Sequence, residues 1–137
     1  MTITFKTLDK TSEDWNKYAN KISEVSWRAG ASLAEKMNNH FFSDWERVIV
    51  GISDDDLVCF CTVSKVDGLA DNTFTPFIGY VFVGETYRGK RVSQQLLSYA
   101  EAYLKELGFQ SIYIVSGEIG LYEKYGYKKN KGLRDYS

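Results

Sequence analysis

The feature that most constrains the fold is a change of hydrophobic pattern within the stretch "PFIGYVFVGETYRGKRVSQQLLSYAEAYLKELGFQSIYIVS". Residues 76–85 are almost continuously apolar, which predicts a buried strand. From Val92 to Leu107 apolar residues recur at helical spacing, and Gly108 is placed to cap that helix. Residues 110–116 predict another strand. Two strands joined through a helix are expected to be parallel, so the chain should contain a β–α–β unit.

The sequence before this unit predicts three more strands and two helices. Residues 3–8 alternate apolar and polar side chains, as a half-buried strand does. Residues 46–53 and 57–66 predict an antiparallel hairpin with a polar turn at Ser53–Asp56. The strand–helix order indicates an α/β or α+β fold with a mixed sheet, and we expect a single domain over residues 1–137.

Both predicted helices lie between the first strand and the hairpin. Residues 11–27 begin with a Thr or Ser cap and acids in the first turn, followed by apolar residues at helical spacing. The second helix is predicted for "GASLAEKMNNHF", with Arg28–Gly30 separating the two. Trp27 and Arg28 at this junction have two open interpretations. They line a pocket for a substrate, or Trp27 fills the core while Arg28 caps helix carbonyls.

Composition narrows the class of protein. The chain has 137 residues, 17 Lys and Arg against 18 Asp and Glu, and a net charge of −1. A near-neutral domain is not expected to bind nucleic acid, which usually requires a basic surface. No apolar run is long enough to cross a bilayer, and "MTITFKTLDK" lacks the pattern of a signal peptide. We therefore expect a cytoplasmic protein without a membrane partner.

The two cysteines, Cys59 and Cys61, are expected to be buried, reduced thiols. At this spacing on a strand both side chains lie on one face and cannot easily form a disulfide. A metal site would need further ligands, and the single histidine, His40, is distant in sequence. We therefore predict no metal.

The turn that joins the predicted strand to the long helix is basic and contains glycine. Its sequence is "RGKRVS", Arg88 to Ser93. The backbone N–H groups at a helix N-terminus lack intrahelical partners and attract anions, and glycine allows close approach of a ligand. The turn therefore either binds a phosphate group or is a solvated basic bend. It matches neither the Gly-x-x-x-x-Gly-Lys-Ser/Thr nor the Gly-x-Gly-x-x-Gly nucleotide loop.

A second motif, "GLYEKYGYKK", follows the last predicted strand and contains Tyr122, Tyr125 and Gly126. With the basic turn, it makes residues 77–128 resemble the GCN5-related N-acetyltransferase (GNAT) family. That family has a (Gln/Arg)-x-x-Gly-x-(Gly/Ala) turn between its fourth strand and third helix, and a terminal Tyr-Glu-Lys-x-Gly-Phe-like segment. The resemblance implies a GNAT-like, mostly antiparallel sheet with a central parallel unit and helices on both faces.

The chain departs from the family pattern at three places. Arg91 stands where the family has glycine, and Ser93 stands where it has glycine or alanine. A bulky Arg91 restricts the approach of a ligand unless its side chain points away or meets a phosphate itself. Residues 127–137 are also few for the C-terminal hairpin that the resemblance implies.

The resemblance implies that acetyl-CoA is the co-substrate and that a primary amine of a small molecule or peptide attacks it directly in a ternary complex. Tyr122 matches the tyrosine that assists the departing thiolate, although a tyrosine of the hydrophobic core is the alternative. The diphosphate is expected at the helix N-terminus and the pantetheine arm beside a bulge in the fourth strand. The implied cofactor-binding residues are Val81, Phe82, Val83, Arg88, Gly89, Lys90, Arg91, Val92, Ser93 and Gln94.

Two questions stay open in the sequence. The protein is either an enzyme or a non-catalytic acyl-CoA-binding module for sensing or assembly, and either form is compatible with a homodimer. A base that deprotonates the amine is not identified by any motif. The carboxylates that flank the predicted strands are expected to be solvated surface groups; they are Asp44, Glu46, Glu85 and Glu118.

Overall fold

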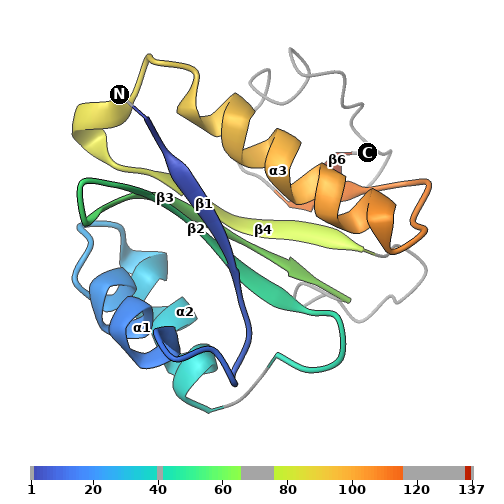
Figure 1. Ribbon diagram of the computed structural model, residues 1–137, viewed down its shortest axis with the longest axis horizontal. Helices are drawn as coiled ribbons and strands as arrows, with labels where there is room; N and C mark the ends of the chain where they lie inside the picture. The colour runs from blue at the N-terminus through green and yellow to red at the C-terminus, as the bar shows by residue number, and fades with distance from the viewer. Residues whose placement is uncertain (1, 40–41, 66–75, 116–134, 137) are drawn as a thin grey trace.

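The computed structural model describes residues 2–39, 42–65, 76–115 and 135–136. Its elements follow one another as expected from the hydrophobic pattern (Figure 1). In chain order they are β1 (Thr4–Leu8), α1 (Trp15–Ser23), α2 (Arg28–Asn38), β2 (Arg47–Ser53), β3 (Asp56–Ser64), β4 (Phe77–Val83), the 3-10 turn η1 (Glu85–Tyr87), α3 (Val92–Glu106), β5 (Tyr113–Val115) and β6 (Asp135–Tyr136).

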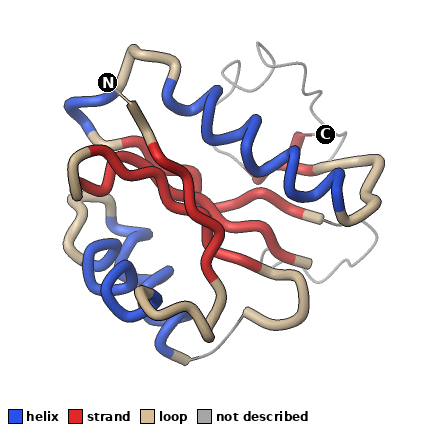
Figure 2. Tube along the Cα trace, viewed as in Figure 1, coloured by secondary structure: helices blue, strands red, loops and turns tan. Residues whose placement is uncertain are grey.

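The strands form one sheet in the order β1-β2-β3-β4-β5-β6 (Figure 2). All neighbouring pairs are antiparallel except β4 and β5, which are parallel and connected through α3. The predicted β–α–β unit and the mixed, mostly antiparallel sheet are therefore confirmed. The short β6 pairs with β5, so the segment after Tyr127 does supply a strand.

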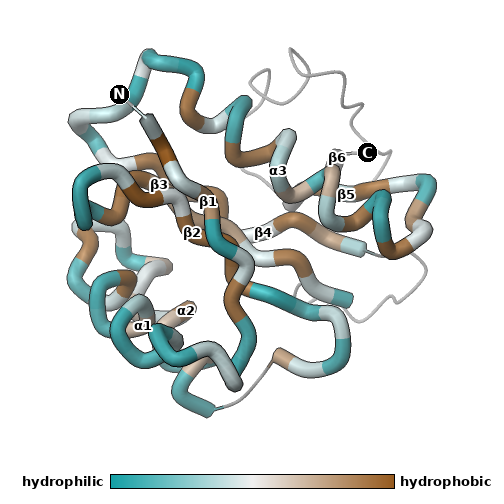
Figure 3. Tube along the Cα trace, viewed as in Figure 1, coloured by the Kyte–Doolittle hydropathy of each residue, from teal (hydrophilic) through white to brown (hydrophobic). Residues whose placement is uncertain are grey.

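Helices cover both faces of the sheet, which confirms the predicted layers. α1 and α2 pack on one face and α3 packs on the other (Figure 1). In β3 the side chains of Cys59 and Cys61 face α3, whereas Phe60 between them faces α1 and α2. In Figure 3 the strands are largely hydrophobic and the outer turns of α1 and α2 are hydrophilic, as a three-layer arrangement requires.

The β2–β3 hairpin closes through Asp54 and Asp55, both of which have positive φ angles, 49° and 65°. Ser53 and Asp56 form the last pair on either side of them. A two-residue loop with two left-handed residues matches the twist of its strands, and aspartate tolerates that backbone better than most residues. The predicted polar turn is therefore confirmed.

The predicted start of the first helix is wrong by several residues. The Asp9 carboxylate accepts bonds from the Thr11 N–H at 2.8 Å and the Thr11 hydroxyl, while the Ser12 hydroxyl accepts the Asp9 N–H at 3.1 Å. These bonds build a turn ahead of the helix rather than a cap. α1 therefore begins at Trp15, after Asp14, and no acid lies in its first turn.

The predicted break between the first two helices is also misplaced, because Arg28–Gly30 form the first turn of α2. Gly30 is required there by close packing rather than by a bend. A Cβ atom at this position would lie 2.6 Å from the Ile22 carbonyl oxygen and 2.6 Å from the Val25 side chain. The glycine lets the start of α2 approach the end of α1.

The end of α3 confirms the predicted glycine cap. Gly108 has a φ of 101°, and its N–H bonds to the Lys105 carbonyl at 3.0 Å. The Phe109 N–H bonds to the Leu104 carbonyl at 3.2 Å, which completes a Schellman motif. Leu107 is 46% exposed and does not share the buried face predicted for it. The sequence also predicts a short helix over residues 118–126, and this segment lies outside the described residues.

Candidate functional site

In the turn between β4 and α3, two of three consecutive residues have a left-handed backbone conformation, with positive φ angles. Gly89 has a φ of 80° and Arg91 a φ of 60°. A Cβ added at Gly89 would meet nothing within 4 Å, so the backbone here borders open space. Turns that include left-handed residues direct successive N–H groups toward one side and form concave anion sites. The turn is thus shaped to receive an anion.

The N-terminus of α3 begins directly at this turn. Arg91 occupies the N-cap position, and its side chain makes no capping hydrogen bond. The first intrahelical bond is donated by the Gln95 N–H to the Arg91 carbonyl at 3.2 Å. The preceding N–H groups have no acceptor within the helix, and the helix dipole adds partial positive charge. With the exposed cations Arg88, Lys90 and Arg91, this end of α3 is strongly anion-attracting.

Arg91 adopts the conformation that a glycine adopts without strain, which explains the family glycine at this place. A non-glycine residue in the left-handed region is destabilised by roughly 1–2 kcal/mol. Arg91 borders a surface pocket of about 590 Å³ between β1 and α3, which is also lined by Phe5 and Tyr99. The strained residue therefore belongs to the turn and also lines this pocket.

We predict that Arg91→Gly makes the free protein more stable, by about 0.5–1 kcal/mol, because relief of strain exceeds the added chain entropy of glycine. Urea unfolding of the two proteins measures the difference. The matched control is Arg88→Gly, since Arg88 has a φ of −68° and no strain to relieve. A loss of stability in Arg91→Gly as large as in Arg88→Gly would contradict the role assigned to backbone strain.

β4, the strand that leads toward the turn, contains a bulge. Phe60 of β3 pairs with Phe82, but Thr62 pairs with Gly79, so β4 advances three residues where β3 advances two. The extra residue lies at Tyr80, whose φ of 50° marks the distortion. Such a bulge re-aims side chains and interrupts pairing. The resemblance implied a bulge in this strand, and the structure has one directly before Val81.

The residues expected to bind the pantetheine arm follow the bulge, and their side chains lie on different faces of the sheet. Val81 and Val83 are half-buried and face α3, whereas Phe82 is buried against α1 and α2. Phe82 can therefore contribute its backbone but not its side chain. Among the described residues β4 pairs with β5 only at Phe77 and Ile78, so the strand continues past that pairing.

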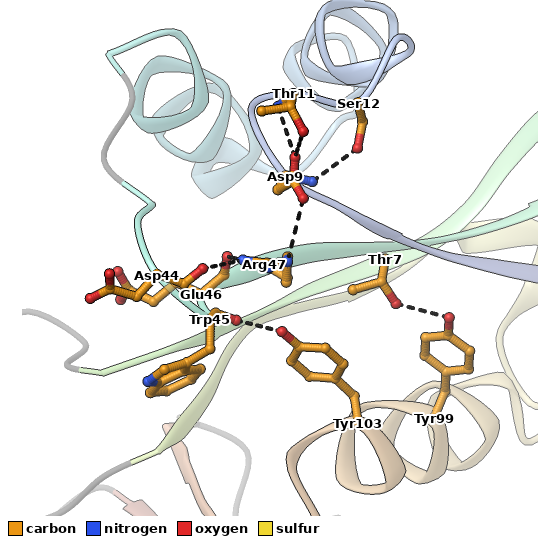
Figure 4. A network of polar contacts seen from close by, with 10 residues as sticks. All are labelled: Thr7, Asp9, Thr11, Ser12, Asp44, Trp45, Glu46, Arg47, Tyr99 and Tyr103. Carbon is orange, nitrogen blue, oxygen red and sulfur yellow. Dashed lines mark hydrogen bonds and ion pairs between the residues drawn. The ribbon is translucent and has the colours of Figure 1, made fainter. Parts of the chain in front are cut away.

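Two hydrogen bonds fix the start of the turn to the sheet. The Gly84 N–H bonds to the Val58 carbonyl at 2.8 Å, and Arg88 Nε bonds to the Val83 carbonyl at 3.2 Å. Two tyrosines of α3 hold the helix itself. Tyr99 and Thr7 share a hydroxyl hydrogen bond of 2.9 Å, and the Tyr103 hydroxyl bonds to the Trp45 carbonyl at 2.7 Å (Figure 4). These bonds join α3 to β1 and to the residue Trp45 ahead of β2.

Of the carboxylates that flank the strands, one is not the solvated surface group that was predicted. Glu46 is 5% exposed rather than solvated, which corrects the expectation of a surface group. Its oxygens accept the Ser43 N–H at 3.1 Å and the Lys65 N–H at 2.9 Å, so its role is structural. Asp44 pairs with Lys65 at the surface, and Glu85 is exposed. Glu118 and Tyr122 lie outside the described residues.

Both cysteines are free and buried, as predicted. Burial raises the pKa of the Cys59 thiol to about 12 and the pKa of the Cys61 thiol well above its ordinary value. The thiolate is the nucleophile of cysteine, so neither residue is suited to carry an acyl group.

We therefore predict that a thiol reagent such as iodoacetamide leaves the native protein unmodified at pH 8, where a group with a pKa of about 12 is almost entirely protonated. Mass spectrometry of native and urea-unfolded protein measures the modification, and only the unfolded protein is expected to gain two adducts. Rapid modification of the native protein would show that a thiol is accessible and reactive.

The family model for the acetyltransferase (GNAT) family matches residues 9–127, most of the chain. The chain belongs to the GNAT acetyltransferase family. The matched region contains β4, the basic turn and α3, and it extends over the segment around Tyr122. Comparison with curated proteins gives no significant match.

Solved structures of low sequence identity share the GNAT fold. A transcriptional regulator from Bacillus halodurans has 18% identity and a TM-score of 0.69, over 96% of this chain and 97% of that one. YhbS from Escherichia coli, solved with CoA, has 17% identity and a TM-score of 0.69, over 98% and 79%. A predicted acetyltransferase from Clostridium acetobutylicum, solved with acetyl-CoA, has 15% identity and a TM-score of 0.68, over 96% and 94%.

Two further findings bear on the class of site. Across the described ranges, no helix is both long and apolar enough to traverse a bilayer. The same part of the chain contains no group of three or more histidine, cysteine or acidic side chains that is placed to hold a metal ion.

Proposed function

We propose that this GNAT protein is an N-acetyltransferase, which moves the acetyl group of acetyl-CoA to a primary amine of a small molecule or peptide. The observation that carries the proposal is the N-terminus of α3, where Arg91 makes no side-chain cap and left-handed Gly89 and Arg91 shape the turn that follows the bulged strand β4. Family relatives solved with acetyl-CoA or CoA support the choice of co-substrate. The proposal treats residues 1–137 as one acetyltransferase domain acting in the cytoplasm without a metal.

The residues of the turn fit a diphosphate. Two adjacent phosphates need several N–H donors and positive charge, and the stretch Gly89–Gln94 supplies backbone donors beside three cationic side chains. The open space beside Gly89 leaves room for phosphate oxygens near the backbone. Arg88 is additionally held by the Val83 carbonyl, so it joins the turn to the strand on which the pantetheine arm would lie.

The strand continues the site toward the reacting atoms. Pantetheine contains amide groups, and the backbone of Val81–Val83 is proposed to pair with them past the bulge. A backbone N–H in this stretch would also stabilise the negative oxygen that develops when the amine attacks the thioester carbonyl. The C–N bond forms, the C–S bond breaks, and the sulfur leaves as a thiolate while the amine loses a proton. Tyr122 is proposed to stabilise that thiolate by a hydrogen bond or by proton transfer.

A non-catalytic acyl-CoA-binding module is the alternative, and the departures at Arg91 and Ser93 are what favour it. Such a module would use the same turn but would have no need of a group that stabilises a thiolate. The segment "LYEKYGY" retains Tyr122, which favours the enzyme. Activity, rather than binding, separates the two proposals.

The first test is binding of acetyl-CoA to the intact protein. At a concentration one hundred times the dissociation constant, the ligand is expected to raise the free energy of unfolding by about 2.7 kcal/mol. Thermal unfolding with and without acetyl-CoA measures this, with acetate as a control that lacks the diphosphate. An unchanged melting temperature would count against both the enzyme and the binding module.

The second test is release of free CoA in the presence of a panel of primary amines. A thiol-reactive dye detects CoA, and the native cysteines do not interfere because they are buried. Amine-dependent release is expected for the enzyme. Stabilisation by acetyl-CoA without release for any amine would favour the binding module.

A further inference from the structure

A surface pocket of about 590 Å³ lies between β1 and the start of α3, and its volume is in the range of sites for small organic ligands. The N-terminal ends of these two elements lie at the same end of the molecule (Figure 1). β1 is the edge strand, and β2 and β3 separate it from β4, so it lies about 14 Å across the sheet from the strand proposed to hold the pantetheine arm. The pocket is lined by Phe5, Arg91, Gln94, Gln95, Ser98 and Tyr99.

Part of this lining is aromatic. The rings of Phe5 and Tyr99 stack on one another, with centroids 5.2 Å apart and an angle of 24° between their planes. The Tyr99 hydroxyl shares a hydrogen bond of 2.9 Å with Thr7, which holds the ring in place (Figure 4). Both rings are partly exposed. They therefore offer a flat apolar surface on which the planar ring of a ligand can pack, offset or edge-on.

The other lining residues are polar and exposed; they are Arg91, Gln94, Gln95 and Ser98. Within the described part of the chain, their side chains make no hydrogen bond or ion pair. Arg91 is the one charged residue among the described lining residues. A guanidinium matches phosphate oxygens with two parallel hydrogen bonds, and the carboxamides and the hydroxyl can both donate and accept. The pocket thus combines a cation, polar groups and a flat aromatic surface.

Arg91 is also where this chain departs from the GNAT pattern, which has glycine at that position. A glycine adopts the left-handed conformation without strain, and it is sufficient for a turn that binds the acetyl carrier through backbone N–H groups. Arg91 keeps that conformation, at a φ of 60°, although its side chain makes it unfavourable. Strained residues are concentrated at functional sites. The arginine therefore indicates a ligand other than the carrier, and Arg91 lines the pocket that could hold it.

We infer that this pocket binds a nucleoside monophosphate, with the phosphate at Arg91 and the base against Phe5 and Tyr99. A base has a flat face and an edge of hydrogen-bond donors and acceptors, which a carboxamide can match. That edge is assigned to Gln95 and Ser98, which are three residues apart and hence neighbours on the surface of α3. The site goes beyond the proposed transfer reaction and is separate from the carrier's site. Because the two sites share Arg91, a nucleotide and acetyl-CoA are expected to weaken each other's binding, which would make the pocket regulatory.

The test is calorimetric titration of the full chain with AMP, GMP, CMP and UMP. At least one of them is expected to bind about tenfold more tightly than its nucleoside or than ribose 5-phosphate, because the base stacks and the phosphate pairs with a guanidinium. Arg91→Gln should weaken that binding about tenfold or more. The matched control is Lys105→Gln, which removes the same charge from an exposed position about 21 Å along α3, beyond the screening length, and should change the affinity less than about threefold. Gln95→Ala combined with Ser98→Ala, both exposed, should weaken binding without unfolding the protein.

Titration at saturating acetyl-CoA separates this site from the carrier's site. Nucleotide binding is expected to persist there, weakened by repulsion between two anions beside one guanidinium. Complete loss of nucleotide binding would place the nucleotide in the carrier's site and overturn the inference. Failure of all four nucleotides to bind, or an equal loss in Arg91→Gln and Lys105→Gln, would also overturn it while the proposed function stands. Nucleotide binding that depends on Arg91, in a protein that acetyl-CoA does not stabilise, would uphold the inference and count against the proposed function.

Discussion

Replacing Tyr122 by phenylalanine is expected to lower kcat about a hundredfold, the lower end of the contribution of a positioned proton donor. The dissociation constant for acetyl-CoA should not change, because the hydroxyl is assigned to the departing sulfur and not to the diphosphate. A free tyrosine has a pKa of about 10 and a thiol about 8.5, so complete proton transfer is uphill by roughly 2 kcal/mol. A hydrogen bond to the thiolate is therefore expected to supply much of the effect.

The matched control is Tyr125→Phe, which removes a hydroxyl from the same short segment. Steady-state kinetics with a saturating amine give kcat, and calorimetry gives the affinity for acetyl-CoA. Full activity in Tyr122→Phe would remove the role assigned to this residue. An equal loss in both variants would indicate that the segment needs these tyrosines for folding rather than for catalysis.

Reversing the charges of Lys90 and Arg91 to glutamate is expected to weaken acetyl-CoA binding about a hundredfold at low ionic strength. Both side chains are exposed at the N-terminus of α3, where the diphosphate is proposed to bind. Hydrogen bonds to charged groups contribute about 1.5–3 kcal/mol each, and the new carboxylates also repel the ligand. The loss of affinity should become smaller as the salt concentration is raised, because exposed charges are screened over about 10 Å at 0.1 M.

The control for this variant is Lys10→Glu with Lys17→Glu, which changes net charge equally at exposed positions distant in sequence from the turn. Its affinity for acetyl-CoA is expected to stay within about threefold of the native value. Unfolding curves establish that both double variants are folded. Equal weakening in both would mean that overall charge, and not the turn, governs binding.

The β–α–β unit could be predicted because its signals are local and agree with one another. An apolar strand, a helical period from Val92 and a glycine at 108 each point to one structure, and the structure has it. The hairpin could be predicted equally well, because Asp54 and Asp55 suit the left-handed turn that joins its strands. The resemblance then identified the family from two motifs that local patterns alone could not interpret.

The errors arose where tertiary contacts decide the local structure. Glycine often marks a break between helices, but Gly30 lies inside a helix. It is glycine because the Ile22 carbonyl leaves no room for a Cβ atom. Threonine and serine are common helix caps, but Thr11 and Ser12 form hydrogen bonds with Asp9 in a turn that precedes the helix. Glu46 looked like a surface carboxylate, but two backbone N–H groups satisfy it in a buried place.

The two parts of the proposed site, the turn before α3 and the bulge in β4, differ in how far the sequence predicts them. Arg88–Gln94 carry a motif, whereas Tyr80 carries none, because a bulge depends on the register of two strands and not on one of them. The contact of Tyr80 with Ser32 joins residues 48 positions apart. The one available signal was a glycine next to a tyrosine within an otherwise apolar strand, which is compatible with a bulge but does not place it.

A crystal structure of the protein with acetyl-CoA tests the central claim most directly. The account predicts diphosphate oxygens within hydrogen-bonding distance, about 2.7–3.2 Å, of backbone nitrogens between Gly89 and Gln94, with the pantetheine arm beside Val81–Val83. Density for the bound ligand at any other surface, with these nitrogens directed to water or to the protein itself, would contradict it.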